Sequence, residues 1–424
     1  MRKFHALYLV ALSVACSDGS GPSGAPASVQ LERTTLELFV GEKKSLRATV
    51  LDARGREARS PLLWSSTNPA VAQVDSMGRI MGVTPGRTDI HVQAGTQSAQ
   101  ATVLVKPTLG FVLPLRGVLN QDFFYTNYVD LQRDAGVRDF QCGLKTYDGH
   151  SGTDIVLPSF TRMDQGIDVV AAAAGTVSFV QDGMPDRNKS WTPGGGFANH
   201  VIIEHREGFR SYYGHMMRNS IRVTAGQQVQ AGAVLGKVGS SGTSDMPHLH
   251  IEFRLQGVPT EVHSGNCGPT FTHWSAPPPY QDELRLIRSG MTRVSLDLDV
   301  AKDPPAQVDT FSANDSRFWF WVHLHNVRAN SLSRFHLITP SGQEITIGSF
   351  VHPQFFSMSW WWVWYPIQGQ LLAGTYRLRY LNDIHVLSER TIVILPGSAA
   401  YRIEVEPSLP RSVVDGGGLS RVHQ

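Results

Sequence analysis

The stretch at residues 147–154 reads Tyr-Asp-Gly-His-Ser-Gly-Thr-Asp, and the stretch at residues 247–253 reads Pro-His-Leu-His-Ile-Glu-Phe. The first contains a His and an Asp four residues apart, and the second contains two His residues two apart. Two imidazoles and one carboxylate are a ligand set that a catalytic zinc accepts while a fourth position stays open for water. If the two stretches meet in space, the chain carries a metal site.

Strand geometry sets what this site requires. His248 and His250 are two residues apart, so on a strand their side chains point to the same face, about 6–7 Å apart. His150 and Asp154 are four apart, and in an extended strand about 13 Å would separate them, which is too far to share one ion. Gly152 must therefore let the chain fold back, or the residues around it must form a turn.

Two other hydrolytic sites are absent from the sequence. No His-Glu-x-x-His pair is present, which excludes a helical zinc site of the thermolysin type. No Gly-x-Ser-x-Gly elbow is present either, because Thr153 stands where the second Gly would be needed after Ser151. The sequence therefore argues against serine hydrolysis through that elbow.

Five sequence blocks together resemble the zinc endopeptidases of the lysostaphin and LytM type. Their order and spacing match that family over roughly residues 145 to 255. Two features depart from the family, Met216 in place of the usual Leu and a longer loop over residues 184–197. The blocks are His-Ser-Gly-Thr-Asp (150–154), Ala-Gly-Thr-Val (174–177), Asn-His-Val-Ile-Ile (199–203), Tyr-Gly-His-Met (213–216) and Pro-His-Leu-His (247–250).

The resemblance implies a role for each residue that matches a family position. His150, Asp154 and His250 would bind one Zn²⁺ per chain, and His248 would be the general base that deprotonates water. His215 would help to stabilise the tetrahedral oxyanion. The family cuts peptide bonds in bacterial peptidoglycan, so a cell-wall peptide is the expected substrate. The alternatives are a non-catalytic factor that activates an amidase and an adhesin with a secondary peptidase.

The composition indicates an all-β protein of several domains. The 424 residues suit two to four domains, and 40 Gly and 24 Pro favour a turn-dense chain. A net charge of +2 without a long basic run argues against nucleic acid as a partner. We expect a signal peptide (1–15), a flexible tether (16–27), a bacterial Ig-like β-sandwich (28–106), a LytM-type β-barrel or sheet peptidase (107–275), a linker (276–284), a C-terminal β-sandwich (285–398) and a disordered tail (399–424).

The first 16 residues predict export. A basic start and a short apolar run precede Leu-Ser-Val-Ala-Cys at 12–16, which resembles a lipoprotein box with Ser13 in place of Leu. Cys16 would then carry a lipid anchor, and Ser17 would favour the outer membrane of a Gram-negative cell; the alternative is an ordinary cleaved signal. Cys142 and Cys267 remain as a candidate disulfide, with thiolate metal ligation as the weaker alternative.

Other conspicuous residues have simpler interpretations. His205 is interpreted as structural, because a fourth protein ligand would close the position that water needs. His323 and His325 copy the His-x-His pattern without a partner His-x-x-x-Asp nearby. Residues 360–365, Trp-Trp-Trp-Val-Trp-Tyr, indicate strand residues that alternate between core and surface, with a glycan- or protein-contact platform as the second interpretation.

Overall fold

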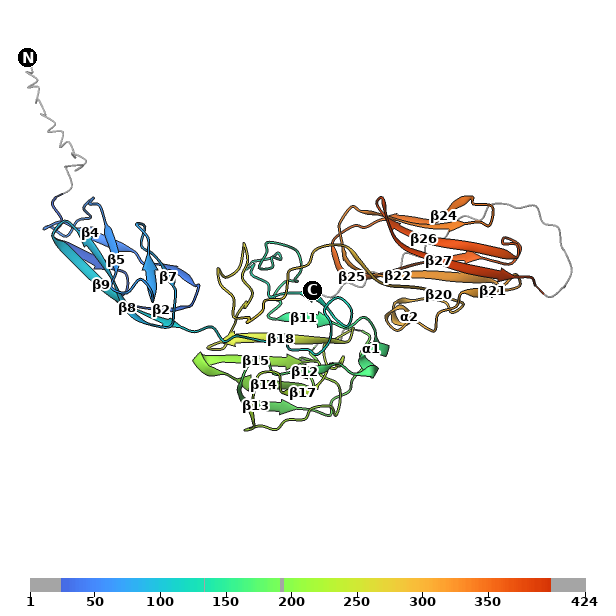
Figure 1. Ribbon diagram of the computed structural model, residues 1–424, viewed down its shortest axis with the longest axis horizontal. Helices are drawn as coiled ribbons and strands as arrows, with labels where there is room; N and C mark the ends of the chain where they lie inside the picture. The colour runs from blue at the N-terminus through green and yellow to red at the C-terminus, as the bar shows by residue number, and fades with distance from the viewer. Residues whose placement is uncertain (1–23, 133, 191–193, 398–424) are drawn as a thin grey trace, which may run out of the picture. The chain divides into compact units, whose positions relative to one another are not determined.

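The computed structural model describes residues 24–132, 134–190 and 194–397, which form two compact units divided after Pro107 (Figure 1). The expected signal peptide with Cys16 and the expected tail from residue 399 lie outside the described residues. Nearly all regular structure is β-strand, which confirms the all-β prediction. Among the described residues, no helix is long and apolar enough to cross a bilayer.

The first unit is a β-sandwich with sheets of four strands (β2-β9-β8-β5) and three strands (β3-β7-β6), plus the pair β1-β4. Alternate residues of both sheets, such as Leu38, Ile80 and Val103, are buried together, and Trp64 packs against this core. The strands are β1 (Ser28–Leu31), β2 (Thr35–Phe39), β3 (Lys43–Ser45), β4 (Ala48–Leu51), β5 (Leu63–Ser66), β6 (Ala72–Val74), β7 (Arg79–Gly82), β8 (Gly86–Ala94) and β9 (Gln97–Lys106).

The second unit begins with a central region, residues 108–275, built on an eight-stranded antiparallel sheet of order β10-β11-β18-β15-β14-β13-β16, with β19 paired to β18 (Figure 1). The two-stranded sheet β12-β17 and the short helix α1, capped by Ser159, complete it. The elements are β10 (Phe124–Asn127), β11 (Thr153–Val156), α1 (Phe160–Gln165), β12 (Asp168–Val170), β13 (Gly175–Gln181), β14 (His200–Glu204), β15 (Phe209–Gly214), β16 (Gln228–Val229), β17 (Val234–Lys237), β18 (His248–Leu255) and β19 (Val258–Pro259).

The rest of the second unit is the C-terminal sandwich, residues 285–397. Its sheets, β20-β22-β25 and β21-β27-β26-β23-β24, enclose a core that includes Phe320, Phe335 and Tyr380. The elements are β20 (Arg285–Thr292), α2 (Leu298–Lys302), β21 (Thr310–Ser312), β22 (Arg317–Val327), β23 (Leu332–Ile338), β24 (Glu344–Val351), β25 (Phe356–Pro366), β26 (Gly374–Asn382) and β27 (His385–Leu395).

Trp360, Trp361 and Trp362 on β25 are buried, so the interpretation of these three residues as an exposed glycan-stacking platform is wrong. Trp360, Trp361 and Trp362 have exposed fractions of 1%, 6% and 4%. Trp361 belongs to the core of the sandwich. The opposite face of the sheet packs against other parts of the second unit, since β10 and α2 both contact β25. Both faces of the strand are therefore covered at these three residues, while Trp364 and Tyr365 near its end are partly exposed.

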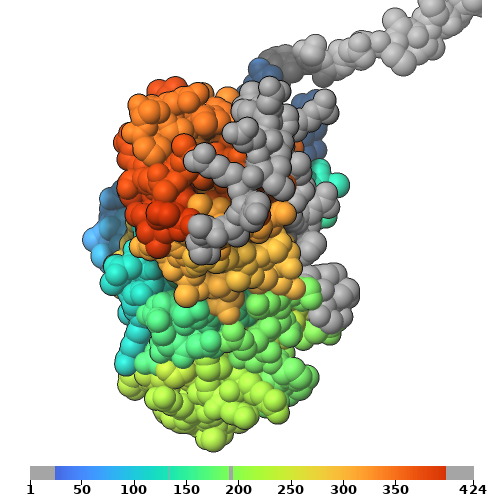
Figure 2. All heavy atoms as spheres, turned by 90° about the vertical axis from the view of Figure 1, so that its right-hand side faces the viewer, coloured from blue at the N-terminus to red at the C-terminus, as the bar shows by residue number. Residues whose placement is uncertain are grey.

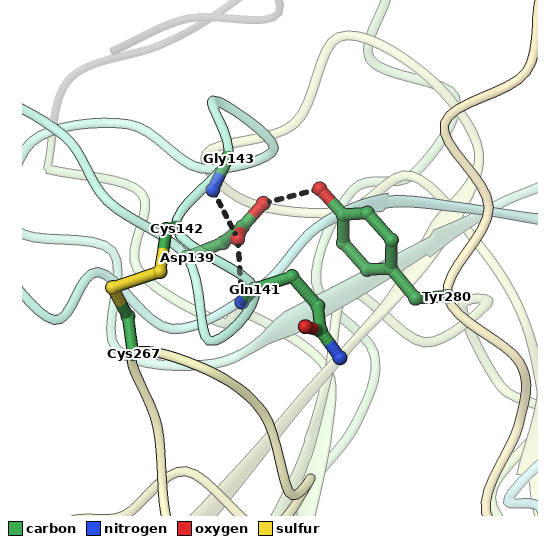
Figure 3. The surroundings of a disulfide bond; sticks show 6 residues. All are labelled: Asp139, Gln141, Cys142, Gly143, Cys267 and Tyr280. Carbon is green, nitrogen blue, oxygen red and sulfur yellow. Dashed lines mark hydrogen bonds between the residues drawn. A yellow bond between two sulfur atoms is a disulfide. The ribbon is translucent and has the colours of Figure 1, made fainter.

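A disulfide lies within the central region, and a polar cluster beside it joins this region to the chain that leads into the C-terminal sandwich (Figure 3). The disulfide links Cys142 to Cys267, so these sulfur atoms are not metal ligands. Beside it, the buried Asp139 carboxylate accepts hydrogen bonds from the backbone N–H groups of Gln141 and Gly143 and from the Tyr280 hydroxyl. Tyr280 lies in the expected linker, which is thereby held against the central region.

Candidate metal centre

Two neighbouring strands bring the halves of the site together. Asp154 on β11 and His250 on β18 are directly paired residues, so their side chains project from the same side of the sheet. His150 precedes β11, where a turn places its backbone N–H 3.0 Å from the Tyr147 carbonyl oxygen. Gly149 supplies the left-handed conformation of this turn, with φ of 74°. The chain therefore bends before His150 as well as between the two ligands.

Gly152 has a different role from the one expected. Its φ is not in the left-handed region, unlike that of Gly149. A Cβ atom at Gly152 would lie 2.6 Å from Nε2 of His250 and 2.8 Å from the carbonyl oxygen of Ile251. Glycine is required there because the His250 ring occupies the space that a side chain would fill.

The three candidate ligand atoms fit a tetrahedral zinc ion. Oδ1 of Asp154 lies 3.3 Å from Nε2 of His150 and 2.9 Å from Nδ1 of His250, and the two nitrogens are 3.3 Å apart. Donor atoms bound at about 2.0 Å to a tetrahedral zinc are about 3.3 Å from one another. All three residues are buried, as expected of a preformed site. Nitrogen and carboxylate donors of this number suit a zinc ion with an open fourth position.

Hydrogen bonds outside the triad fix which donor atoms face the site. Nδ1 of His150 donates to the carbonyl oxygen of Tyr128 at 2.7 Å, so Nε2 keeps its lone pair. Asn127 donates to Oδ2 of Asp154 at 3.0 Å, which leaves Oδ1 to the centre. On the far side of its ring, Nε2 of His250 has no hydrogen-bond partner and lies 3.7 Å from Oε2 of the buried Glu252.

His215 and His248 lie beside the triad with their ring centroids 4.6 Å apart. His215, which follows β15, donates from Nδ1 to the carbonyl oxygen of Ser241 at 2.8 Å. His248 donates from Nδ1 to the carbonyl oxygen of Met246 at 2.8 Å, and its Nε2 is 3.6 Å from Oδ1 of Asp154. A carbonyl oxygen only accepts, so each neutral imidazole presents the lone pair of Nε2.

Burial and the neighbouring ionisable groups determine whether Asp154 and His215 carry a proton. Burial alone would raise the pKa of Asp154, but the adjacent imidazoles of His150, His250 and His248 hold that pKa well below its usual range. Burial, followed by the charges of His248 and His250, lowers the pKa of His215 well below its usual value. Asp154 is thus ionised and His215 neutral. A donor role for His215 toward an oxyanion requires that it first gain a proton on Nε2.

A cleft of about 260 Å³ opens onto the site. Its walls are partly aromatic, since Tyr147 stacks on His150 and Phe197 stacks on His250. Phe197 ends the longer loop that the sequence marked, which places the end of this loop at the cleft. The lining residues are Tyr147, Gly149, His150, Ser151, Gly196, Phe197, His215, Thr243 and His250.

The remaining candidate histidines lie apart from this cluster. Both ring nitrogens of His205 are used, by the carbonyl oxygen of Ala174 and by Oγ of Ser211, as expected of a structural residue. His323 and His325 are buried on β22, with His323 stacked on Trp360. Among the described residues, the triad is the one group of three or more His, Cys, Asp or Glu whose donor atoms converge in this way.

Sequence reasoning missed the residues that support the site. Glu252 could have been found, because it is two residues after His250 on the same strand and so shares its face. Asn127, Ser241 and Met246 come from other elements, and no spacing in the sequence points to them.

Comparison with known proteins finds two family matches in the chain. Residues 148–262 match peptidase family M23, and residues 26–105 match the bacterial Ig-like domain of group 2. A DD-carboxypeptidase/endopeptidase, Mpg of Neisseria meningitidis serogroup B, is 35% identical over 116 residues, which are 27% of this chain and 22% of Mpg. The murein hydrolase activator EnvC of Escherichia coli K12 is 39% identical over 90 residues, 21% of this chain and 20% of EnvC.

Among solved structures, a mutant catalytic domain of the prophage-encoded M23 protein EnpA from Enterococcus faecalis is similar at 30% identity and a TM-score of 0.23, covering 32% of this chain and 82% of that domain. The chain spans about a fifth of the length of the curated relatives named above. The chain contains a domain of peptidase family M23, preceded by a bacterial Ig-like domain of group 2.

Proposed function

We propose that the chain is a zinc metalloendopeptidase that hydrolyses peptide bonds in the cross-links or bridges of bacterial peptidoglycan. The observation that carries the proposal is the convergence of donor atoms from His150, Asp154 and His250 at tetrahedral spacing in an open cleft. A zinc ion held by these residues would polarise the scissile carbonyl and lower the pKa of water to about 7.

His248 is the proposed general base. Its Nδ1–H is committed to the Met246 carbonyl oxygen, so the Nε2 lone pair beside the ligand cluster is free to take a proton from the attacking water. The water oxygen then bonds to the peptide carbon. The same Nε2 proton can pass to the leaving amide nitrogen as the carbon–nitrogen bond breaks, which returns His248 to its starting state.

His215 is the proposed oxyanion donor, in its protonated form. Its Nδ1–H is held by the Ser241 carbonyl oxygen, so only Nε2 is free to face the substrate. Removing a donor of this kind lowers kcat by about 100- to 1,000-fold. A His215→Gln variant keeps an N–H donor, so it should retain more activity than His215→Ala. Equal losses in the two variants would argue that His215 acts as a base.

The test is digestion of purified peptidoglycan with mass spectrometry of the fragments, together with metal analysis. Wild type should bind close to one zinc per chain and release peptide fragments, while His248→Ala should bind zinc and release none. A variant of the exposed His385 serves as the control. Equal products from wild type and His248→Ala would refute the mechanism. Binding without cleavage, with stimulation of an amidase, would favour the activator alternative suggested by the similarity to EnvC.

We also propose that the protein is exported and anchored through a lipid on Cys16, on the evidence of the lipoprotein-like box. This places the peptidase at the envelope, where peptidoglycan is found. Metabolic labelling with a palmitate analogue should mark wild type and leave Cys16→Ser unlabelled. Equal labelling of the two would contradict the anchor.

A further inference from the structure

We infer that the C-terminal sandwich positions the catalytic histidines through Lys302, an inference that rests on the proposed function. Lys302 ends α2 and is 2% exposed, although it carries a charge. Its ammonium group donates to the carbonyl oxygen of Lys189 at 2.6 Å and to Oδ2 of Asp245 at 3.1 Å. Both acceptors belong to the central region, which the sandwich contacts (Figure 2).

The contact reaches residues 240–246, here called the backing segment, which immediately precede the His-x-His strand. This segment supplies the acceptors for both catalytic histidines: the carbonyl oxygen of Ser241 holds Nδ1 of His215, and the carbonyl oxygen of Met246 holds Nδ1 of His248. Oγ of Ser244 adds a second contact to Nδ1 of His248 at 3.2 Å. Any shift of the backing segment therefore reorients both rings.

Lys302 contacts the backing segment directly through Asp245 and indirectly through Lys189. Asp245 belongs to the segment itself and lies between Ser244 and Met246. Lys189 is next to Asn188, which is tied to the segment by a hydrogen bond from its backbone N–H to the Ser240 carbonyl oxygen and another from its side chain to the Gly242 carbonyl oxygen.

The serines of the segment continue this network toward His248. Oγ of Ser240 donates to the Asn188 carbonyl oxygen at 2.7 Å and lies 2.9 Å from Oγ of Ser244. Thus the ammonium of one residue from the sandwich joins a continuous network that ends at the imidazole of the proposed base.

Because the Lys302 ammonium is buried, its hydrogen bonds to Lys189 and Asp245 have a preferred geometry. A buried ammonium is stable only when its N–H groups are paired, so Lys302 is held where both acceptors can be reached. Neighbouring contacts are more exposed: Lys189 donates to the Asp299 carbonyl oxygen, and Arg187 pairs with Asp303. These exposed contacts join the same two parts of the chain, and their removal should matter less.

The experiment compares Lys302→Met with Lys302→Arg and Lys189→Met in the full chain. Loss of a residue that orients catalytic groups lowers activity about tenfold or more, so Lys302→Met should lower kcat on a cross-linked muropeptide by that factor with KM nearly unchanged. Lys302→Arg should restore most of kcat, because guanidinium N–H groups can reach the same acceptors. Lys189→Met removes the exposed contact to Asp299 and the ammonium that lies over the Phe160 ring, keeps the backbone carbonyl that accepts from Lys302, and should match wild type.

A second readout needs neither zinc nor turnover. In the metal-free protein, ¹⁵N histidine spectra report whether His215 and His248 carry the proton on Nδ1, and Lys302→Met should mix the two tautomers. If Lys302→Met folds and keeps both the tautomer pattern and the kcat of wild type, the inference is overturned. It is also overturned if Lys189→Met loses as much kcat as Lys302→Met. If Lys302→Met does not fold, Asp245→Asn is measured by the same two readouts and judged by the same outcomes. A wild type that cleaves nothing contradicts the proposed function alone, because the spectra still test the positioning.

Discussion

Replacement of Gly152 by alanine tests the geometry of the metal centre most directly. A Cβ atom there would lie 2.6 Å from Nε2 and 2.7 Å from Cε1 of His250, whereas ordinary contacts begin near 3.4 Å. The ring would have to retreat by about 0.8 Å, while metal–ligand distances tolerate about 0.2 Å. The backbone cannot yield easily instead, since the Ile251 carbonyl oxygen is 2.8 Å from the same atom.

The expected result is a large loss of zinc affinity with a smaller loss of stability. Mutating a partner outside the ligand shell costs about 10- to 100-fold in affinity, so displacing a ligand itself should cost at least about 100-fold. Zinc affinity is measured by competition with a chromophoric chelator, and thermal unfolding of the metal-free protein is followed in parallel. Movement of the His250 ring would also disturb its stacking on Phe197.

Gly257→Ala is the matched control for this variant. Gly257 lies between β18 and β19 with φ of 86°, and a Cβ atom added there would have no neighbour within 4 Å. That substitution should cost about 1 kcal/mol of backbone strain and leave zinc affinity unchanged. Wild-type zinc affinity in Gly152→Ala would refute the argument that the absent side chain makes room for the His250 ring.

Three further changes have expected outcomes. Glu252→Gln removes the carboxylate behind His250 and should lower zinc affinity about 10- to 100-fold in the same competition assay, whereas unchanged affinity would contradict a supporting role. Burial lowers the pKa of Lys145 to about 7, against about 10.4 in an unfolded chain, so the unfolded state binds more protons between these values. The stability of wild type relative to Lys145→Met should therefore rise with pH from about 7 to 10 in denaturant titrations; a flat difference would contradict this. Changing both Cys142 and Cys267 to Ser removes a disulfide whose cysteines are 125 residues apart in sequence. Because the disulfide limits the conformational freedom of the unfolded chain, its loss should lower the free energy of unfolding by about 5 kcal/mol. A decrease below about 1 kcal/mol would refute this reasoning.

Local sequence patterns were enough to predict the strand that carries His248 and His250. His248 and His250 share a face of β18 because side chains alternate along a strand, and the structure confirms this placement. The same alternation buries Leu249 and Ile251 on the other face. The spacing of His150 and Asp154 required a bend, and Gly149 beside His150 made that bend easier; the structure places a left-handed conformation at Gly149 and not at Gly152.

The tryptophan run shows where such patterns fail. Alternation correctly implied that Trp361 and its two neighbours face opposite sides of β25. It could not show that both sides are covered, because β10 and α2, which contact this strand, are far from it in sequence. Burial of the second face depends on long-range packing, which no local period encodes.

The sequence by itself determined the all-β class, the ligand types and the strand that bears His250, because these follow from residue chemistry and from periodicity over a few residues. Only the tertiary structure decided how the donor atoms converge, which nitrogen of each histidine faces the cleft, and that Lys302 contacts the backing segment. Those features depend on contacts between residues about a hundred positions apart, such as His150 and His250. Such partners become neighbours only when the strands pair.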